Sequence, residues 1–292
     1  MNMKKQSSLL SKILTYIPLI LLSITIIVPV AWVFVASIKE NQEFYRNPWS
    51  IPEGIHLQNF VDAWQKADMG SYMLNSVIVT ALALVLLIVI SLPASYVLSR
   101  FKFRTRGFWN TLFMAGLFIN VNYIVVPIFL MLVDADAFLR RIGGQPFFLN
   151  NIFILAVIYA TTALPFTIYL LSGYFKTVPK DFEEAAYMDG AGYFRTMVQI
   201  IIPMAKPSII TVILFNFLSF WNEYIISMTM LTKAELKTLP VGLMNLMAAQ
   251  KSAVQYGQMY AGLVIVMLPT LILYMCVQKN LTKGMTVGGL KG

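Results

Sequence analysis

Residues 179–207 read PKDFEEAAYMDGAGYFRTMVQIIIPMAKP. This segment is polar, and it lies between two apolar runs that are each long enough to cross a bilayer. Pro179 suits a first helical position, because its fixed φ is helical and its missing N–H would lack a partner there. Acidic residues favour the positive end of a helix dipole, and three follow closely: Asp181, Glu183 and Glu184. The segment therefore predicts a helix that begins near residue 179.

The spacing of apolar residues divides this segment into two helices. One helical face, at i, i+3, i+4 and i+7, holds Phe182, Ala185, Ala186 and Asp189. Gly190 and Gly192 then break the helix, since glycine tolerates positive φ. A second helical face follows and ends at Pro203; it holds Phe194, Met197, Val198 and Ile201. We therefore expect two short helices joined at a glycine hinge.

The composition is that of a polytopic membrane protein. Of the 292 residues, 58% are hydrophobic and only 12% are charged, which is far less charge than a soluble domain carries. Six apolar runs reach about the 20 residues that a spanning helix needs. They predict an all-α protein with six transmembrane helices at 13–36, 74–98, 109–132, 152–174, 208–231 and 259–278.

The distribution of basic residues predicts the orientation of these helices. In this arrangement 14 of the 22 Lys and Arg residues fall on one side, which the positive-inside rule makes the cytoplasm. The N-terminal segment 1–12, the loop 175–207 and the tail 279–292 are then cytoplasmic, and loop 37–73 is outside. We expect residues 1–292 to form a single transmembrane domain.

The first outer loop carries a helical pattern of its own. Asn59 is a candidate N-cap with Asp62 at the third position, and apolar residues then repeat at helical spacing: Phe60, Ala63, Trp64 and Ala67. This pattern predicts a short interfacial helix on the outer leaflet. Membrane anchoring explains it better than contact with a partner protein.

Several kinds of site are disfavoured by the residues present. The net charge of +9 is scattered between apolar spans rather than gathered in a groove-sized patch, so we expect no nucleic-acid partner. Cys276 is the single cysteine and His56 the single histidine, so no metal site and no catalytic site is predicted. The sequence has no GxxxxGK[ST] motif, and we expect this chain to bind no cofactor and not to hydrolyse ATP.

Polar residues near the centres of the predicted spans are candidates for a translocation pathway. They are Asn120, Asn122, Thr161, Thr162, Asn216, Ser219 and Asn222. Such side chains face either neighbouring helices or a water-filled cavity, and both interpretations stay open. Glu223 is the only carboxylate inside a predicted span. It either lines a cavity or is an interfacial carboxylate capped by backbone donors.

The loop also carries a spaced motif. Glu184-Ala185-Ala186 is followed after three residues by Gly190 and, nine residues later, by Ile200-Ile201-Ile202-Pro203. This arrangement resembles the EAA loop of ABC importer permeases and departs from it only at Ile202, where leucine is usual. Further segments resemble the MalG-like subunits of the maltose-type carbohydrate importers: Asn75-Ser76, Trp221-Asn222-Glu223-Tyr224, Leu239-Pro240-Val241-Gly242-Leu243 and the glycine-rich tail 284–292.

The resemblance implies a type I ABC importer permease fold in the cytoplasmic membrane of a bacterium or archaeon, surrounded by membrane lipid. It implies four kinds of partner: a homologous second permease, two ATPase subunits that hold ATP and Mg, an extracytoplasmic solute-binding protein, and a carbohydrate substrate. It also makes the first short helix of the loop the coupling helix that contacts the ATPase. The residues implied in coupling are Glu183, Glu184, Ala185, Ala186, Asp189, Gly190, Ile200 and Pro203.

Three alternatives remain at this stage. The EAA pattern does not specify a cargo, so an ABC permease for a mineral, peptide or other non-sugar solute stays open. An ion-coupled secondary transporter favours a carboxylate near the midplane, and Glu223 is the one candidate for it. A membrane-embedded enzyme has the least support, because the sequence shows no cluster of catalytic side chains.

Overall fold

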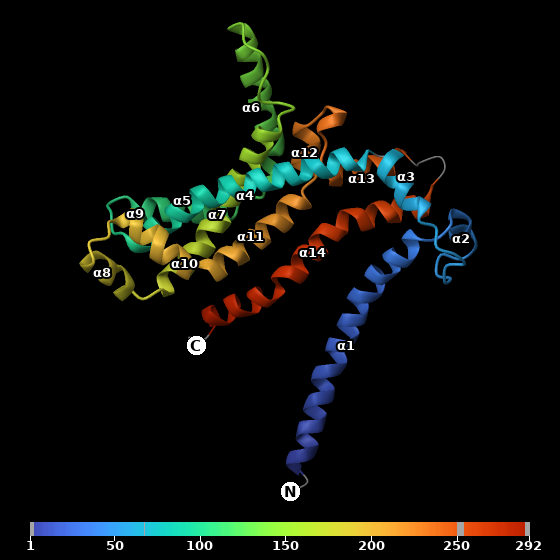
Figure 1. The fold of residues 1–292 in the computed structure, drawn as a ribbon, viewed down its shortest axis with the longest axis horizontal. Helices are drawn as coiled ribbons and strands as arrows, with labels where there is room; N and C mark the ends of the chain where they lie inside the picture. Colours follow the sequence, from blue (N-terminus) through green and yellow to red (C-terminus); the bar gives the residue numbers. More distant parts are fainter. Residues whose placement is uncertain (1–2, 67, 250–253, 290–292) are drawn as a thin grey trace. The chain divides into compact units, whose positions relative to one another are not determined.

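The computed structural model describes residues 3–66, 68–249 and 254–289, with side chains in 11–65, 68–248 and 254–278. In that part of the chain every regular element is helical (Figure 1). Residues 1–2 of the predicted N-terminal segment and residues 290–292 of the predicted tail lie outside the described residues. The longer helices are α1 (Met3–Ser37), α4 (Met69–Arg100), α5 (Arg106–Gly116), α6 (Val121–Arg141), α7 (Ile152–Thr177), α11 (Lys206–Trp221), α13 (Leu239–Ala249) and α14 (Tyr256–Gly289).

Short elements connect these helices. The loop between α7 and α11 holds α8 (Asp181–Met188), α9 (Tyr193–Thr196), the π-helix η1 (Met197–Ile201) and α10 (Ile202–Met204). The remaining short elements are α2 (Asn41–Arg46), α3 (Gln58–Lys66), α12 (Ile225–Met230) and the 3₁₀ helix η2 (Ala234–Leu236).

Five described helices are long and apolar enough to cross a membrane: Ser11–Ser37, Met69–Arg100, Val121–Arg141, Ile152–Thr177 and Tyr256–Gln278. A sixth candidate consists of two helices, Tyr193–Met204 and Lys206–Trp221, which meet at a bend of 76°. The all-helical membrane fold is therefore confirmed, with up to six spans. Two of the predicted spans, however, differ from the helices observed.

The predicted third span, 109–132, is not one continuous helix. α5 ends at Gly116 and α6 begins at Val121, with Asn120 as its N-cap: the Asn120 side chain accepts the N–H of Asn122 at 3.0 Å. A Cβ on Gly116 would lie only 2.7 Å from the ring of Pro165 in α7, so α5 approaches α7 closely there. The membrane-length helix is α6, and the prediction placed this span too early in the chain.

The predicted fifth span, 208–231, is broken near its end. α11 stops at Trp221, and residues 222–224 separate it from α12. The Glu223 carboxylate caps α12, because its Oε1 accepts the N–H of Ile226 at 2.7 Å and its Oε2 accepts the N–H of Ser227 at 3.0 Å. A side-chain cap of this kind starts a new helix where hydropathy alone predicts that the old one continues.

The chain forms two compact units, the larger of which comprises residues 70–242 and 268–292. Its main core is built from one face of α4, with Val79, Ala83 and Leu87 at i, i+4 and i+8, against Leu155 and Tyr159 of α7. A second core lies beside the loop that joins α7 to α11. Gly242 also has a packing role, since a Cβ there would overlap the ring of Tyr72. The prediction that 1–292 is one domain stays a prediction.

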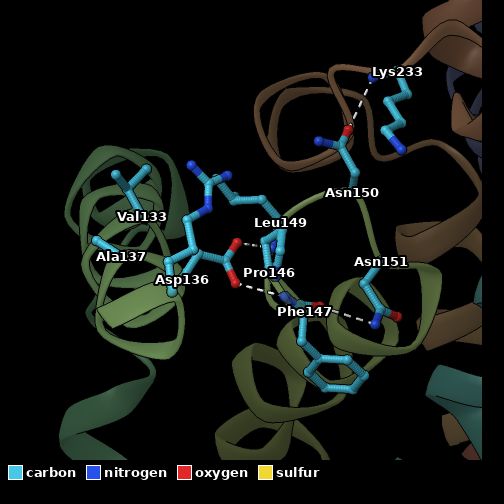
Figure 2. Close-up of a pocket in the computed structure, with 10 residues that line it drawn as sticks. Val133, Asp136, Ala137, Pro146, Phe147, Leu149, Asn150, Asn151 and Lys233 are labelled. Carbon is cyan, nitrogen blue, oxygen red and sulfur yellow. Dashed lines mark hydrogen bonds between the residues drawn. The ribbon is translucent and has the colours of Figure 1, made fainter. Parts of the chain in front are cut away.

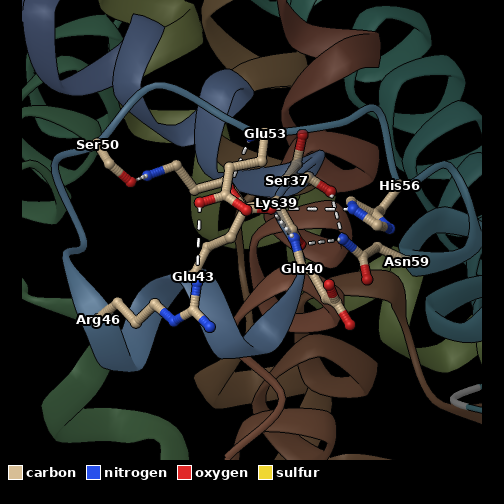
Figure 3. Close-up of polar contacts among 9 residues, drawn as sticks. All are labelled: Ser37, Lys39, Glu40, Glu43, Arg46, Ser50, Glu53, His56 and Asn59. Carbon is tan, nitrogen blue, oxygen red and sulfur yellow. Dashed lines mark hydrogen bonds and ion pairs between the residues drawn. The ribbon is translucent and has the colours of Figure 1, made fainter.

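The smaller unit comprises residues 1–69 and 243–267. Within it, a polar cluster holds the segment between α1 and α3 (Figure 3). Lys39 is fully buried, and its Nζ donates to the Pro48 carbonyl at 2.8 Å and to Ser50 Oγ at 3.3 Å. Glu43 is also buried and accepts the backbone N–H groups of Glu40 and Glu53, both at 3.0 Å. A buried Lys and Glu satisfied in this way fix the course of the loop.

The electrostatics of Glu43 follow from these contacts. Burial raises the pKa of the Glu43 carboxyl, but the two backbone hydrogen bonds and the charges of His56 and Lys39 outweigh burial, so the pKa lies below its ordinary value. The His56 ring lies 3.8 Å from Glu43 Oε1. This cluster was not predicted, because its members are spread along an irregular segment with no periodic signal.

The outer-loop helix predicted around residue 60 exists as α3, but its start was wrong. The helix begins at Gln58, so Asn59 lies inside it and is not its N-cap. The Asn59 side chain instead donates to the carbonyls of Ser37 at 3.0 Å and Lys39 at 2.8 Å. α4 also begins at Met69, before the predicted start at residue 74.

Candidate functional site

α8 has termini that its sequence explains. Acidic residues occupy its first turn, and the helix begins at Asp181 rather than at Pro179. Gly190 follows its C-terminus with φ +80°, and the N–H of Ala191 donates to the Ala186 carbonyl at 2.9 Å. This is the hydrogen-bonding pattern of a Schellman cap, which needs a residue in the left-handed region. The predicted break at Gly190 is confirmed.

α8 exposes most of the face that the sequence analysis identified. Phe182 is 44% exposed, and Ala185 and Asp189 are also exposed. Met188, which is not part of that predicted face, is 88% exposed. Ala186 is the one buried member of the predicted face. Small and apolar side chains on an exposed helix face allow a partner to approach closely, so α8 presents a surface suited to docking.

The two glutamates of α8 differ sharply in environment. Glu184 is exposed, whereas Glu183 is buried and its Oε1 lies 3.1 Å from Nε of Arg100, at the end of α4. The same guanidinium donates through NH2 to the carbonyls of Val178 at 2.7 Å and Pro179 at 3.4 Å. Glu183, which the resemblance places among the coupling residues, is therefore not available to a basic partner, because Arg100 of this chain already pairs with its carboxylate.

The surroundings of the pair are aromatic. The Tyr96 hydroxyl is buried near Glu183 and Tyr187 but makes no hydrogen bond of good geometry. Burial raises the pKa of the Tyr187 hydroxyl, and the nearby charge of Glu183 raises it further. The Tyr187 ring also packs edge-on against Tyr193, with centroids 5.3 Å apart, which joins α8 to α9.

The second half of the loop differs from its prediction because it contains a π-helix. Met197 and Ile201 are buried in the core beside α4 and α7, while Phe194 and Val198 are exposed. All four were expected on one face. A π-helix has more residues per turn than an α-helix, so η1 rotates the four side chains onto different faces.

The loop joins α11 at a sharp bend. The helical path continues one residue beyond Pro203, to Met204, before the 76° turn at Ala205. The Tyr174 hydroxyl donates to the Met204 carbonyl at 2.9 Å. This bond gives a partner to a carbonyl at the end of α10, where the bend interrupts the helical hydrogen bonds. Ile200 is half-buried and Pro203 is exposed.

The candidate pathway residues fall into two groups. The side chains of three of them start a helix or bond to another helix: Asn120 caps α6, Glu223 caps α12, and Asn216 is buried and donates to Thr167 Oγ1 of α7 at 3.0 Å. The Tyr159 hydroxyl also donates to Glu223 at 2.6 Å. For Glu223, this favours the interpretation as a capped carboxylate. For Asn216 it favours an interhelical hydrogen bond.

The other group is open to its surroundings. Asn122, Ser219 and Asn222 are exposed, and Ser219 and Asn222 lie on one face of α11 and its C-cap. Thr161 lines a cavity of about 270 Å³ whose other walls are mostly apolar, from α5, α6 and α7. The neighbouring Thr162 also lines it. These residues remain candidates for a pathway.

A larger cavity of about 420 Å³ lies between the end of α6, the segment before α7 and the segment after α12 (Figure 2). Asp136 is buried in its wall and accepts the backbone N–H groups of Phe147, Phe148 and Leu149 at 2.7–3.0 Å. Across it, Asn150 Oδ1 accepts the N–H of Lys233 at 2.9 Å. Asp136 was missed because α6 runs past the predicted end of the third span, so the observed helix includes a carboxylate that the predicted span did not.

Comparison with known proteins identifies the family. Residues 88–287 match the family described as "Binding-protein-dependent transport system inner membrane component". The chain belongs to this family. It is thus an ABC transporter permease with several membrane-spanning helices, as the EAA pattern indicated, and the ion-coupled carrier loses its support.

Individual relatives agree with this assignment. The permease is 34% identical over 92% of its length to the diacetylchitobiose uptake system permease protein NgcG of Streptomyces coelicolor, of which it covers 86%. It is 29% identical over its whole length to the maltodextrin transport system permease protein MalD of Streptococcus pneumoniae, of which it covers 99%. It shares its fold (TM-score 0.78, 24% identity, 94% of this chain and 97% of the other) with a chain in the crystal structure of a bacterial ABC transporter involved in the import of alginate.

Proposed function

We propose that this permease is half of the membrane pathway of an ATP-driven importer for a sugar or oligosaccharide. The relatives described above are named as permeases of a diacetylchitobiose uptake system and a maltodextrin transport system, and this chain matches them over most of its length. The partners would be a homologous second permease, two ATPase subunits that hold ATP and Mg, and an extracytoplasmic solute-binding protein. The protein would lie in a bacterial or archaeal cytoplasmic membrane with both termini inside.

The exposed face of α8 is the observation that supports coupling to the ATPase. Its exposed side chains include Phe182, Glu184, Ala185 and Met188, although the loop on either side is packed into the chain. A helix with a small apolar face and exposed carboxylates, Glu184 among them, fits a groove that carries basic residues. α8 continues into α9–α10 and then into α11, so movement of the docked helix would tilt a candidate span.

The size of the required coupling constrains this mechanism. Near-complete switching of a two-state cavity needs about 5.5 kcal/mol of differential binding. A loop that transmits this free energy has to be stiff. The buried Arg100–Glu183 pair, the Tyr187–Tyr193 contact and the core positions Met197 and Ile201 support that stiffness.

Reconstitution tests the proposal. The permease is purified with its second permease and ATPase, placed in proteoliposomes with the solute-binding protein, and supplied with radiolabelled oligosaccharide. We expect uptake that requires ATP and each of the subunits. Uptake by the permease alone under an ion gradient would contradict the proposal. Uptake of a mineral or peptide, but of no carbohydrate, would keep the ATP-driven mechanism and exclude the sugar cargo.

A further inference from the structure

The two glutamates of α8 differ in their contacts, because Arg100 pairs with Glu183 and leaves Glu184 exposed. Arg100 is the last residue of α4, and its side chain is 6% exposed; that of Glu183 is 10% exposed. The guanidinium makes three contacts with the segment that enters α8: Glu183 at 3.1 Å, Val178 at 2.7 Å and Pro179 at 3.4 Å. A planar guanidinium suits this combination, since its donors point in several fixed directions.

The end of α4 is itself held in place. Arg106 Nε donates to the Leu98 carbonyl at 2.8 Å and its NH2 to the Ser99 carbonyl at 3.2 Å. These bonds satisfy carbonyls at the C-terminus of α4, where a cation is also favoured by the helix dipole. Arg100 therefore extends from a fixed helix end rather than from a mobile loop.

From this geometry we propose that Arg100 and Glu183 are positioning residues that couple α8 to α4, while Glu184 is the acid that α8 presents to a partner. The inference rests on the proposed function, because it adds a second connection through which movement of α8 reaches the membrane helices of the transporter. Covalently, α8 leads to α7 on one side and to α11 on the other. The buried pair adds α4, so that movement of α8 is transmitted to three long helices.

The pair is suited to this role by its burial. A buried ion pair resists separation, since pulling the partners apart leaves a charge without compensation. In an exposed pair, water and salt would screen the attraction between the two charges, so the pair would separate more easily when α8 moves. Glu184 is exposed, one residue away on the same helix, and is therefore the matched comparison for Glu183.

Charge variants in the assembled transporter test the coupling. Arg100→Met and Glu183→Gln should each lower uptake per ATP hydrolysed by at least about fivefold, the lower end of measured allosteric couplings. The exchange Arg100→Glu with Glu183→Arg should restore part of the loss, because the ion pair returns but the bonds to Val178 and Pro179 do not. Lys102→Ala removes an exposed charge two residues from Arg100 and should leave the ratio unchanged.

A distance measurement keeps the proposal testable if a variant assembles poorly or if the wild-type complex does not transport. Spin labels are placed at Lys102→Cys and Met188→Cys, both exposed, in full-length permease with Cys276→Ser, in nanodiscs. We expect one narrow distance distribution, which Arg100→Met broadens. The proposal is overturned if Arg100→Met leaves this distribution unchanged, or if both single charge variants transport with the wild-type ratio. Failure of the wild-type complex to transport would count against the proposed function alone.

Discussion

The two halves of loop 175–207 lie in opposite environments. α8 exposes a face of small and apolar side chains, while the helix formed by α9, η1 and α10 buries Met197 and Ile201 against α4 and α7. The first half has a surface left for a partner. The second half is fixed to the membrane helices. The difference indicates that a transmitting loop needs one end that docks and one end that is anchored, with a stiff joint between them.

The largest effect is expected from the docking half. Glu184→Lys reverses the charge of an exposed carboxylate on α8, and like charges across an interface cost several kcal/mol. We expect uptake to be abolished and ATPase subunits to co-purify poorly, while the permease inserts and melts normally. Glu184→Gln is the matched control with a smaller loss. Normal uptake by Glu184→Lys would remove the distinction between the two halves.

The joint between the halves comes next. Gly190 has φ +80°, so Gly190→Val places a β-branched side chain in the left-handed region and opposes the Schellman cap. We expect about a 100-fold loss of uptake, as for other small misplacements of functional groups. Gly192 has φ −74° with open space at its Cβ, so Gly192→Ala should retain uptake. Equal losses in the two variants would mean that glycine itself, rather than the φ of Gly190, matters.

The anchored half should respond through stability. Ile201→Ala removes a fully buried side chain, and such truncations cost about 2–5 kcal/mol. Val198→Ala alters an exposed residue of the same π-helix and should change stability by less than about 0.5 kcal/mol. Thermal melts in detergent, followed by tryptophan fluorescence, distinguish them. A similarly small change in melting temperature for both variants would contradict the anchoring of this half.

The smallest effect concerns pH. Burial and the charge of Glu183 raise the pKa of Tyr187, so the folded permease favours the protonated phenol. The corresponding stability is present below the ordinary tyrosine pKa of about 10 and is lost as pH rises through the higher folded value. We expect the melting temperature to fall less between pH 9 and about 11 in Tyr187→Phe than in wild type. A wild-type-like fall in Tyr187→Phe would assign the effect to other groups.

The sequence predicted those features that depend on long or strongly periodic patterns. The membrane class, α1, α4, α7 and α14 as spans, and the helix break at Gly190 follow from apolar run length and from glycine chemistry. The sequence did not predict the breaks within the third and fifth spans. They are made by side chains that cap new helices, Asn120 and Glu223, inside runs whose average hydropathy stays high.

The errors in the site have tertiary causes. Glu183 and Glu184 are neighbours of the same chemical type, and no local pattern shows that Arg100, 83 residues away, pairs with one of them. The exposure of Phe194 and Val198 follows from a π-helix, which an α-helical period cannot anticipate. Asn59 was assigned as a cap although its side chain reaches back to Ser37 and Lys39.

Site-specific photocrosslinking in the assembled transporter tests the central claim most directly. A photoreactive residue replaces Ala185, on the exposed face of α8, and a matched one replaces Phe138, which is 61% exposed near the end of α6. The account predicts an adduct with the ATPase from position 185 and none from position 138. An ATPase adduct from position 138 but not from position 185, or an adduct of position 185 with the solute-binding protein, would contradict it.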